Sequence, residues 1–419
     1  MPEFDLGWVR DQFPSLSQEI NGQPMTFFDG PGGTQVPRST IAAMSDYLIH
    51  SNANAHGAFV TSGRTDALID RTRSAVADLL GCSANEIVFG ANMTTLTFAI
   101  SRAIGRELQA GDEIVTTKLD HYANISPWNA LEERGVVIRT LDIQVEDCTI
   151  DLDQLAGLLN ERTRLVAIGY ASNAVGTIND VATITKLVHG VGAMVFVDAV
   201  HYAPHGAIDV RTLDCDFLAC SAYKFFAPHI GILYGKHEHL SRLQPYKVAP
   251  ASNDVPSRWE TGTQSYEAMA GLVETINYLR QLGQRVDPSS SSRRAALVAG
   301  MTAIHAYEQE LSRYLLSGLA RVPGLTVYGI TDLDRVIERT PTVGIRLQGY
   351  SPHDLAKQLG EQGIFTWNGN FYAVGVTEAL GIESSGGLLR MGLVHYNTIE
   401  EIDRLLKALD KLAVTQYSE

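Results

Sequence analysis

The stretch Val195-Phe196-Val197-Asp198-Ala199-Val200-His201 places an acidic residue at the end of an apolar run. Downstream, Cys220-Ser221-Ala222-Tyr223-Lys224-Phe225 places a lysine among apolar and aromatic residues, where an exposed lysine is not expected. An aldehyde cofactor needs an amine to hold it as a Schiff base, and a pyridine ring that stores electrons needs a carboxylate beside its nitrogen. Lys224 and Asp198 supply these groups. The pair therefore indicates a site for pyridoxal 5′-phosphate (PLP).

Short apolar runs alternate with helical patterns on both sides of this pair. Runs without alternating polar positions suit a sheet that helices cover on both faces, which is the α/β arrangement. In such folds the functional residues gather where strands end and loops begin. The pattern predicts strands at 136–141, 165–170, 194–197, 217–220 and 230–234, with helices at 152–161 and 181–188.

Composition restricts the class of protein. The chain has 419 residues, of which 45% are hydrophobic and 19% charged, as in a soluble globular protein. The net charge of −14, without a basic cluster, argues against nucleic-acid binding, so a small-molecule substrate is expected. The four cysteines show neither metal spacing nor a disulfide framework, so we expect no metal and a reducing compartment. We find no signal peptide and no apolar stretch near ~20 residues, which predicts a cytoplasmic protein without membrane contact.

The serine run at 289–292 is the clearest break in composition. A long helix is expected over 294–319, and capping signals at Ser351-Pro352 and Thr398-Ile399-Glu400-Glu401 predict two further helices. We therefore predict an N-terminal segment, 1–30, that packs with the small domain, a large PLP-binding domain, 31–287, and a small C-terminal domain, 288–419.

The phosphate of PLP requires backbone amides and hydroxyls at a helix start. The stretch Gly90-Ala91-Asn92-Met93-Thr94-Thr95 separates a predicted strand, 86–89, from a predicted helix, 96–108. Thr94 is the first candidate and Thr95 the second, with Met93 beside them and the Ser221 hydroxyl as a further donor. The alternative is an ordinary cap on a core helix.

The cofactor ring requires a flat partner and a hydrogen-bond donor. His121 follows a predicted strand and is a candidate for stacking, and so we count it with Lys224 and Asp198 as a catalytic residue. Asn173 follows another strand and could donate to the phenolic oxygen. Taken alone, each is a common loop or turn residue.

With these residues in place, the chain resembles the class V aminotransferase family of PLP enzymes, specifically its cysteine desulfurase and selenocysteine lyase branch. The resemblance extends from Phe28-Asp29-Gly30-Pro31-Gly32-Gly33 to the segment that begins at Arg390-Met391-Gly392. It implies a PLP-dependent transferase of fold type I, an α/β fold in which a mainly parallel seven-stranded sheet is joined by a smaller α+β domain. The motifs that carry it are Asp120-His121-Tyr122-Ala123-Asn124-Ile125, Ser172-Asn173-Ala174-Val175-Gly176-Thr177, and Leu213-Asp214-Cys215-Asp216-Phe217 ahead of Lys224.

The resemblance also implies a homodimer with shared active sites. Glu260-Thr261-Gly262-Thr263-Gln264 is similar to the family segment that reaches the phosphate of the neighbouring subunit, so Gly262 and Thr263 carry over as ligands across the interface. Arg390 matches the family arginine that holds the substrate α-carboxylate, a group that a guanidinium binds through two hydrogen bonds.

Two cofactor positions differ from the desulfurase pattern. His201 stands where a desulfurase has glutamine, and Tyr223 stands where it has the histidine before the lysine. Both side chains can hydrogen-bond the cofactor, so PLP binding is still expected.

The loop that carries the persulfide-forming cysteine in this branch reads Phe365-Thr366-Trp367-Asn368-Gly369-Asn370-Phe371-Tyr372-Ala373-Val374 and contains no cysteine. Cys82, Cys215 and Cys220 are expected to be packing residues. The sequence therefore favours a C–S lyase that eliminates the sulfur of cysteine, cystine or a cysteine conjugate. An aminotransferase or oxidative deaminase and a non-catalytic PLP-binding scaffold are the alternatives. The expected residues around the amino-acid substrate are Arg390, Asn173, His56, Asn370 and Tyr372, with Trp367 nearby.

Overall fold

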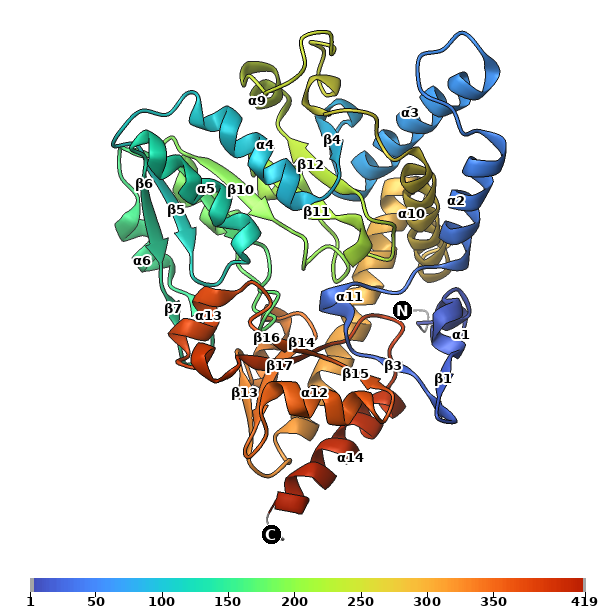
Figure 1. The fold of residues 1–419 in the computed structure, drawn as a ribbon, viewed down its shortest axis with the longest axis vertical. Helices are drawn as coiled ribbons and strands as arrows, with labels where there is room; N and C mark the ends of the chain where they lie inside the picture. The colour runs from blue at the N-terminus through green and yellow to red at the C-terminus, as the bar shows by residue number, and fades with distance from the viewer. Residues whose placement is uncertain (1–3, 417–419) are drawn as a thin grey trace.

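A computed structural model describes residues 4–416 and contains two principal sheets, which lie one above the other in Figure 1. The large sheet has seven strands in the order β4-β12-β11-β10-β9-β5-β6. All neighbouring pairs are parallel except the two that β12 makes, so the expected mainly parallel sheet is confirmed. The strands are β4 (Ile87–Gly90), β5 (Glu113–Thr117), β6 (Val137–Leu141), β9 (Thr163–Gly169), β10 (Met194–Asp198), β11 (Phe217–Ser221) and β12 (Gly231–Gly235).

Helices precede, connect and follow these strands, with a long helical pair at the end. They are α1 (Leu6–Asp11), α2 (Arg38–His50), α3 (Val60–Leu80), α4 (Met93–Gly105), α5 (Ser126–Asn129), α6 (Leu152–Leu158), α7 (Val181–His189), α8 (Val210–Leu213), α9 (His237–Arg242), α10 (Tyr266–Val286) and α11 (Arg293–Leu319).

The large sheet is buried on both faces, which explains why its strands lack polar alternation. Along β10, Val195 and Val197 belong to the core shared with α3, α7 and α10, whereas Phe196 belongs to the core shared with α4 and α9. Successive strand residues point to opposite faces, so both sets must be apolar.

The second sheet is antiparallel, with the order β13-β14-β17-β16, and shares a core with α11, α12 and α14. Helix α11 packs against α3 and α10 as well as α14, so it connects the two sheets. The N-terminal strand β3 pairs with β15. The remaining elements are β13 (Leu325–Tyr328), β14 (Thr342–Leu347), α12 (Pro352–Gly360), β15 (Ile364–Phe365), β16 (Trp367–Gly369), α13 (Val374–Ala379), β17 (Leu388–Gly392), α14 (Ile399–Gln416), β1 (Glu19–Ile20), β2 (Gln23–Pro24), β3 (Thr26–Phe27), β7 (Ile143–Gln144) and β8 (Thr149–Ile150).

The element boundaries follow the capping residues. Helix α4 begins three residues earlier than expected, because the Asn92 side chain accepts from Thr95 N at 2.9 Å and Thr95 reciprocates. The predicted cap at Ser351 is confirmed by a 3.1 Å bond from Asp354 N. The predicted capping box is also confirmed, since Thr398 and Glu401 bond reciprocally at 3.2 Å.

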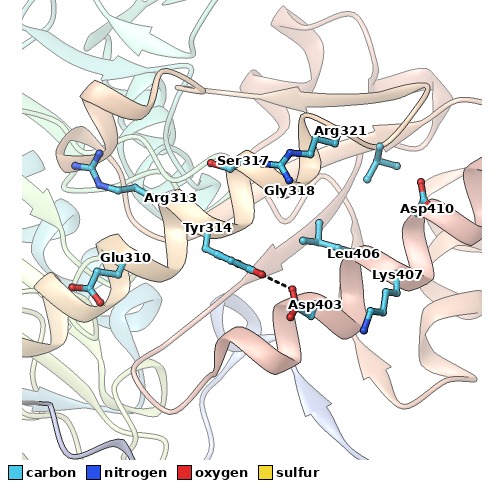
Figure 2. Close-up of a pocket in the computed structure, with 11 residues that line it drawn as sticks. Glu310, Arg313, Tyr314, Ser317, Gly318, Arg321, Asp403, Leu406, Lys407 and Asp410 are labelled. Carbon is cyan, nitrogen blue, oxygen red and sulfur yellow. Dashed lines mark hydrogen bonds between the residues drawn. The ribbon is translucent and has the colours of Figure 1, made fainter.

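A surface groove of about 660 Å³ runs between α11 and α14 (Figure 2). The Tyr314 hydroxyl donates to Asp403 across it at 2.6 Å. Its lining shares no residue with the cavity at the edge of the large sheet, which contains Lys224. Within residues 4–416, no helix is both long and apolar enough to span a bilayer.

Candidate active site

A cavity of about 750 Å³ lies at the carboxyl ends of the parallel strands, where α/β sheets bind their ligands. The ends of β9, β10 and β11 and the first residues of α4 meet there, together with the loop between β16 and α13. Most of the predicted site residues line it: Met93, Thr94, Thr95, His121, Asn173, Asp198, His201, Ser221, Tyr223, Lys224, Tyr372 and Arg390.

Lys224 ends a short 3₁₀ turn, Ala222–Lys224, directly after β11. Its Nζ donates to the carbonyl of Pro31 and lies 4.9 Å from the centre of the Tyr223 ring. Burial, followed by the positive charge of Arg390, lowers the pKa of Lys224 to about 7. A substantial fraction of this amine is therefore neutral near pH 7 and can act as a base or nucleophile.

Asp198 is the last residue of β10 and is buried. Its Oδ1 accepts from Val200 N at 2.9 Å, which fixes the carboxylate at the strand end. Burial raises the pKa of Asp198 to about 6, and the Lys224 charge opposes this rise. A buried carboxylate of this kind suits a cationic partner such as a protonated ring nitrogen.

The first turn of α4 forms one end of the cavity. Met93 N donates to the Ser221 hydroxyl at 2.9 Å, so the helix start and the end of β11 are joined. The Thr95 hydroxyl is used by the helix cap, whereas Thr94 is exposed. A helix N-terminus with hydroxyls beside it is suited to a phosphate.

His121 and Asn173 lie on loops after β5 and β9. The Nδ1 of His121 accepts from Ala123 N at 2.9 Å, so the ring proton belongs on Nε2. Burial and the charges of Lys224 and Arg390 lower the pKa of His121 to about 4, so the ring is neutral. Asn173 donates to the Phe371 carbonyl at 3.0 Å, and its Oδ1 is buried without a partner among the described residues.

His201 and Tyr223, the two residues that differ from the desulfurase pattern, each contact a side chain within the chain. The Nε2 of His201 lies 3.2 Å from the Thr340 hydroxyl, and burial holds the pKa of this imidazole well below its usual range. The Tyr223 ring stacks on His229 at 4.7 Å with an interplanar angle of 12°. Both side chains line the cavity.

Arg390 lies on β17 and is buried. Its Nη1 donates to the Asn173 carbonyl at 2.8 Å, and the guanidinium carbon lies 4.0 Å from the centre of the Phe371 ring. The Nε is buried and has no partner among the described residues. Burial lowers the pKa of Arg390 to about 9, opposed by Asp29, so the group remains a cation at neutral pH.

Four predicted residues do not line this cavity. His56 does not line the cavity of its own chain, since its side chain is 88% exposed and its Nδ1 lies 3.1 Å from Asp66, so its contact with the substrate stays a prediction. Asn370 is wrongly placed, because its amide donates to Glu383 at 2.8 Å and so supports the loop from behind. Gly262 and Thr263 are exposed elsewhere on the chain, so their role across an interface stays a prediction.

The four cysteines all lie outside the cavity lining. Burial raises the pKa of Cys82 and Cys220 to about 12 and that of Cys148 to about 11, and it raises the pKa of Cys215 further. These thiols are protonated at neutral pH and are poor nucleophiles. Cys215 and Cys220 are buried and Cys82 is half-buried against the core, which is consistent with the prediction that all three are packing residues.

Sequence reasoning missed Asp29, Phe371 and His229. Asp29 is close enough to Arg390 and Lys224 for their charges to act on it, and burial raises its pKa to about 6. The turn Gly30-Pro31-Gly32-Gly33 beside it was the available signal. A Cβ at Gly32 would lie 2.4 Å from Trp367 Nε1, so a larger residue there would displace the Trp367 ring. Phe371 and His229 gave no signal in the sequence.

Comparisons with known proteins agree over the whole chain. A sequence model of the aminotransferase class-V family matches residues 26–405. A cysteine desulfurase from Dickeya dadantii (strain 3937) is 34% identical over 426 residues, which cover 98% of this chain and 97% of the relative. A probable cysteine desulfurase from Synechocystis sp. (strain PCC 6803) is 33% identical, covering 96% of this chain and 94% of the relative.

Solved structures of similar proteins have the same fold. An apo cysteine desulfurase from Thermococcus onnurineus NA1 superimposes with a TM-score of 0.88 at 25% identity, over 99% of each chain. A cysteine desulfurase from Escherichia coli, solved in an S-sulfonic acid form, superimposes with a TM-score of 0.83 at 25% identity, also over 99% of each chain. Both agree with the architecture of two sheets described above.

Proposed function

Since the chain belongs to the class-V aminotransferase family of PLP-dependent enzymes, we propose that it is a cysteine desulfurase-like C–S lyase. It eliminates the sulfur group from the β-carbon of cysteine, cystine or a cysteine conjugate. One observation carries the proposal: the pocket loop between β16 and α13 contains no cysteine, although Lys224, Asp198 and Arg390 surround the cavity. A persulfide mechanism needs a reactive thiolate. An elimination needs a base, a group that binds the substrate carboxylate and a leaving group on the substrate.

The cavity fits PLP by the chemistry of its donors. Lys224 would hold the aldehyde carbon, Asp198 the ring nitrogen, and Ser221 with the first turn of α4 the phosphate. The Oδ1 of Asn173 has no partner among the described residues, and the neutral ring of His121 lines the cavity, so the two could supply a polar and a flat contact. When bound, PLP supplies an electron sink for the charge that develops at the substrate α-carbon.

Arg390 would orient the substrate by its α-carboxylate. Nη1 is already held by the Asn173 carbonyl, so the edge of the guanidinium that contains the unpartnered Nε is left for the ligand. Lys224 Nζ would then take the proton from the α-carbon, a role that its lowered pKa allows at neutral pH.

The overall reaction balances with one water. The Cα–H and Cβ–S bonds break, the sulfur leaves as sulfide from cysteine or as a thiol from a cysteine conjugate, and hydrolysis of the released enamine gives pyruvate and ammonium. No oxidant is consumed. From cystine the leaving thiol is cysteine persulfide, which a reductant converts to cysteine and sulfide.

We also propose that the enzyme is a cytoplasmic homodimer. A pair of helices, α2 and α3, carries exposed apolar side chains close together in sequence, among them Ile49, Phe59 and Val60. Exposed apolar side chains that gather in one region often mark an interaction surface, which supports association of two chains.

The product assay tests the function. The PLP-loaded protein is mixed with cysteine, cystine and S-substituted cysteines, and pyruvate and thiol are measured together. We expect equal amounts of both, and we expect Lys224→Ala to lower the rate at least about 10³-fold because the base is removed. Lys186→Ala, which alters an exposed lysine on α7, is the matched control and should keep the native rate. A keto acid formed without released sulfur would instead identify a transaminase.

A further inference from the structure

Two consecutive residues of the pocket loop, Phe371 and Tyr372, have left-handed backbones, with φ of +57° and +59°. Such conformations are unfavourable for bulky side chains, at a cost of about 1–3 kcal/mol each, and persist only where the surrounding contacts impose them. Strain of this kind is concentrated at functional sites, so the contacts that maintain it indicate what the turn is for.

Hydrogen bonds hold both carbonyls of this turn against loops that line the cavity. Asn173 donates to the Phe371 carbonyl at 3.0 Å, and Tyr122 N donates to the Tyr372 carbonyl at 2.8 Å. From behind, Asn370 accepts from Tyr372 N at 3.1 Å while its own amide binds Glu383. The turn is therefore a fixed part of the cavity wall.

The side chains of this turn face the groups that would bind the substrate. Phe371 covers the Arg390 guanidinium, and the Tyr372 ring lies 5.4 Å from His121, tilted by 32°. Trp367, on the neighbouring β16, lies against Gly32. Tyr372 and Trp367 remain 70% and 51% exposed, so apolar ring surface is left uncovered at the cavity.

The rest of the cavity offers no charge for a substrate side chain. Its lining contains four acidic or basic residues other than histidine: Asp120, Asp198, Lys224 and Arg390. Asp120 is bonded to Thr117 and Asn124, and burial raises its pKa to about 7. The other three are committed to the cofactor and to the α-carboxylate in the proposed function.

We propose that Trp367, Phe371 and Tyr372 form an aromatic wall that selects amino acids with a neutral, apolar side chain. Under the proposed lyase function, on which this substrate class rests, the preferred substrates are cysteines whose sulfur carries an apolar substituent, ahead of cysteine itself. An apolar side chain is favoured because it covers the exposed rings, and a charged one is rejected because it loses water without gaining a partner.

Binding of amino acids that lack a sulfur leaving group tests the wall without elimination. L-phenylalanine, L-alanine and L-aspartate are titrated into the PLP-loaded protein and followed by calorimetry and by the cofactor absorbance. We expect L-phenylalanine to bind at least about tenfold more tightly than L-alanine, and L-aspartate to bind most weakly. Phe371→Gly, which allows the same backbone without the ring, should reduce the preference for L-phenylalanine over L-alanine severalfold.

Two controls separate the wall from general effects. Asn21→Gly also removes a side chain at a left-handed position, with φ of +53°, but in the exposed turn between β1 and β2. It should leave all three affinities unchanged. Arg390→Ala should weaken all three amino acids alike. Equal affinity of the native protein for L-phenylalanine and L-aspartate, or an unchanged preference in Phe371→Gly, would overturn the wall.

Reactive substrates separate this inference from the proposed function. Comparable kcat/KM for cysteine, S-methylcysteine and S-benzylcysteine would keep the lyase and overturn the wall. Preferential binding of S-benzylcysteine without thiol or pyruvate would keep the wall and overturn the lyase. Failure of every amino acid to bind would overturn both.

Discussion

At the scale of single residues, Lys224 lies close enough to one guanidinium, Arg390, and to two carboxylates, Asp198 and Asp29, for their charges to shift its pKa. Burial is the first cause of every shift: it lowers the pKa of Lys224 to about 7 and raises that of Asp29 to about 6. The neighbouring charges then determine the final values, since Arg390 lowers the pKa of Lys224 while Asp198 and Asp29 raise it. These residues therefore titrate as a coupled group.

The pH dependence of proton removal should follow Lys224. The neutral amine is the base, so exchange of the α-proton of L-alanine with D₂O should rise with pH and level off above about 7. Asp29→Asn removes a charge that raises this pKa and should move the profile to lower pH, by up to about one unit. Proton NMR measures the exchange, and Asp46→Asn, an exposed aspartate on α2, is the control. A shift to higher pH would contradict this account.

At the scale of secondary-structure elements, the strands that end at the cavity were predictable, because burial on both faces makes them apolar throughout. The starting residue of α4 was missed because Asn92 and Thr95 cap each other. The turn at Phe371 and Tyr372 could not be predicted, because its backbone depends on Asn173 and Tyr122, which are distant in sequence. For the same reason Asn370, although in the expected loop, turns away from the cavity.

The packing of α10 against α11 depends on glycine. A Cβ at Gly283 would lie 1.7 Å from the Ala296 carbonyl oxygen, a backbone atom that cannot move aside. We expect Gly283→Ala to destabilise the fold by about 1–3 kcal/mol or more, measured as a lower midpoint temperature in calorimetry. Gly157→Ala, in α6, meets no atom within 4 Å and should be neutral or stabilising by up to about 1 kcal/mol. Equal midpoints for the two variants would rule out close helix packing.

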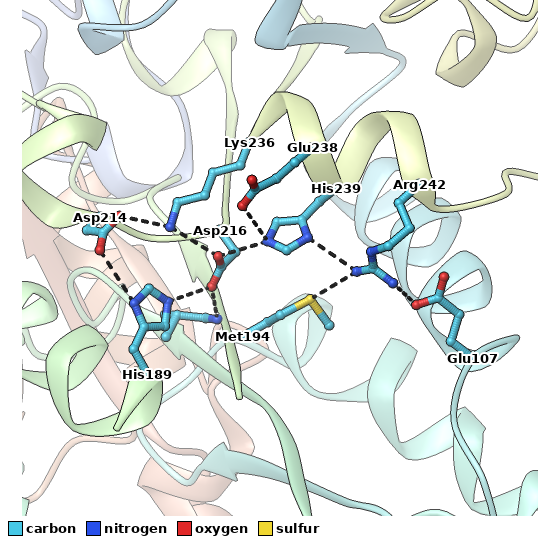
Figure 3. Close-up of polar contacts among 10 residues, drawn as sticks. Glu107, His189, Met194, Asp214, Asp216, Lys236, Glu238, His239 and Arg242 are labelled. Atoms are coloured by element: carbon cyan, nitrogen blue, oxygen red, sulfur yellow. Dashed lines mark hydrogen bonds and ion pairs between the residues drawn. The ribbon is translucent and has the colours of Figure 1, made fainter. Parts of the chain in front are cut away.

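At the amino end of β11, opposite the cavity, Asp216 joins several elements (Figure 3). It accepts from Val195 N at 2.7 Å and lies 2.9 Å from His189 Nε2 and 3.0 Å from His239 Nε2. Burial alone would raise its pKa, but hydrogen bonds from His239, His189 and Val195, with the charge of Lys236, hold the pKa of Asp216 well below its usual 3.8.

This carboxylate should make stability depend on pH. Because its pKa is lower in the folded than in the unfolded chain, its contribution is complete above about pH 4 and is lost as the pH falls further. Asp216→Asn should lower the free energy of unfolding by about 2–3 kcal/mol at pH 7, and by less at pH 3, in urea titrations. Asp214→Asn, at an exposed left-handed position that suits asparagine, should change it by less than about 0.5 kcal/mol.

At the scale of the whole molecule, the segment with Gly262 and Thr263 is joined through Glu260 to the strand that leads into α4, at one end of its own cavity. Glu260 accepts from Phe89 N at 2.8 Å and pairs with Arg73 at 2.6 Å, and Phe89 belongs to the strand that leads into α4. In a symmetric dimer both chains use the same surface. The segment around Gly262 and Thr263 would then support the cavity of its own chain and contribute to that of the neighbouring chain. A role for Gly262 and Thr263 could be predicted only from the family resemblance, because one chain leaves both residues exposed.

Mixed dimers test the shared site. Lys224→Ala and Thr263→Ala chains should each be impaired alone, the second mainly in retaining PLP. Co-expressed, they should recover up to about a quarter of the native activity, because half of the dimers are mixed and each mixed dimer has one intact site. Separately tagged chains allow the mixed dimer to be purified and assayed. Activity no higher than the average of the two parents would place Thr263 outside the neighbouring site.

The raised pKa values of the four thiols have a practical consequence for experiments on this protein. With every native cysteine protonated near neutral pH, maleimides and other alkylating reagents should modify the folded chain slowly. A single cysteine introduced on the surface would then be labelled almost alone, without prior removal of the others. The pocket loop could be scanned in this way, one position at a time, with spin labels or fluorophores that report when an amino acid binds beside it.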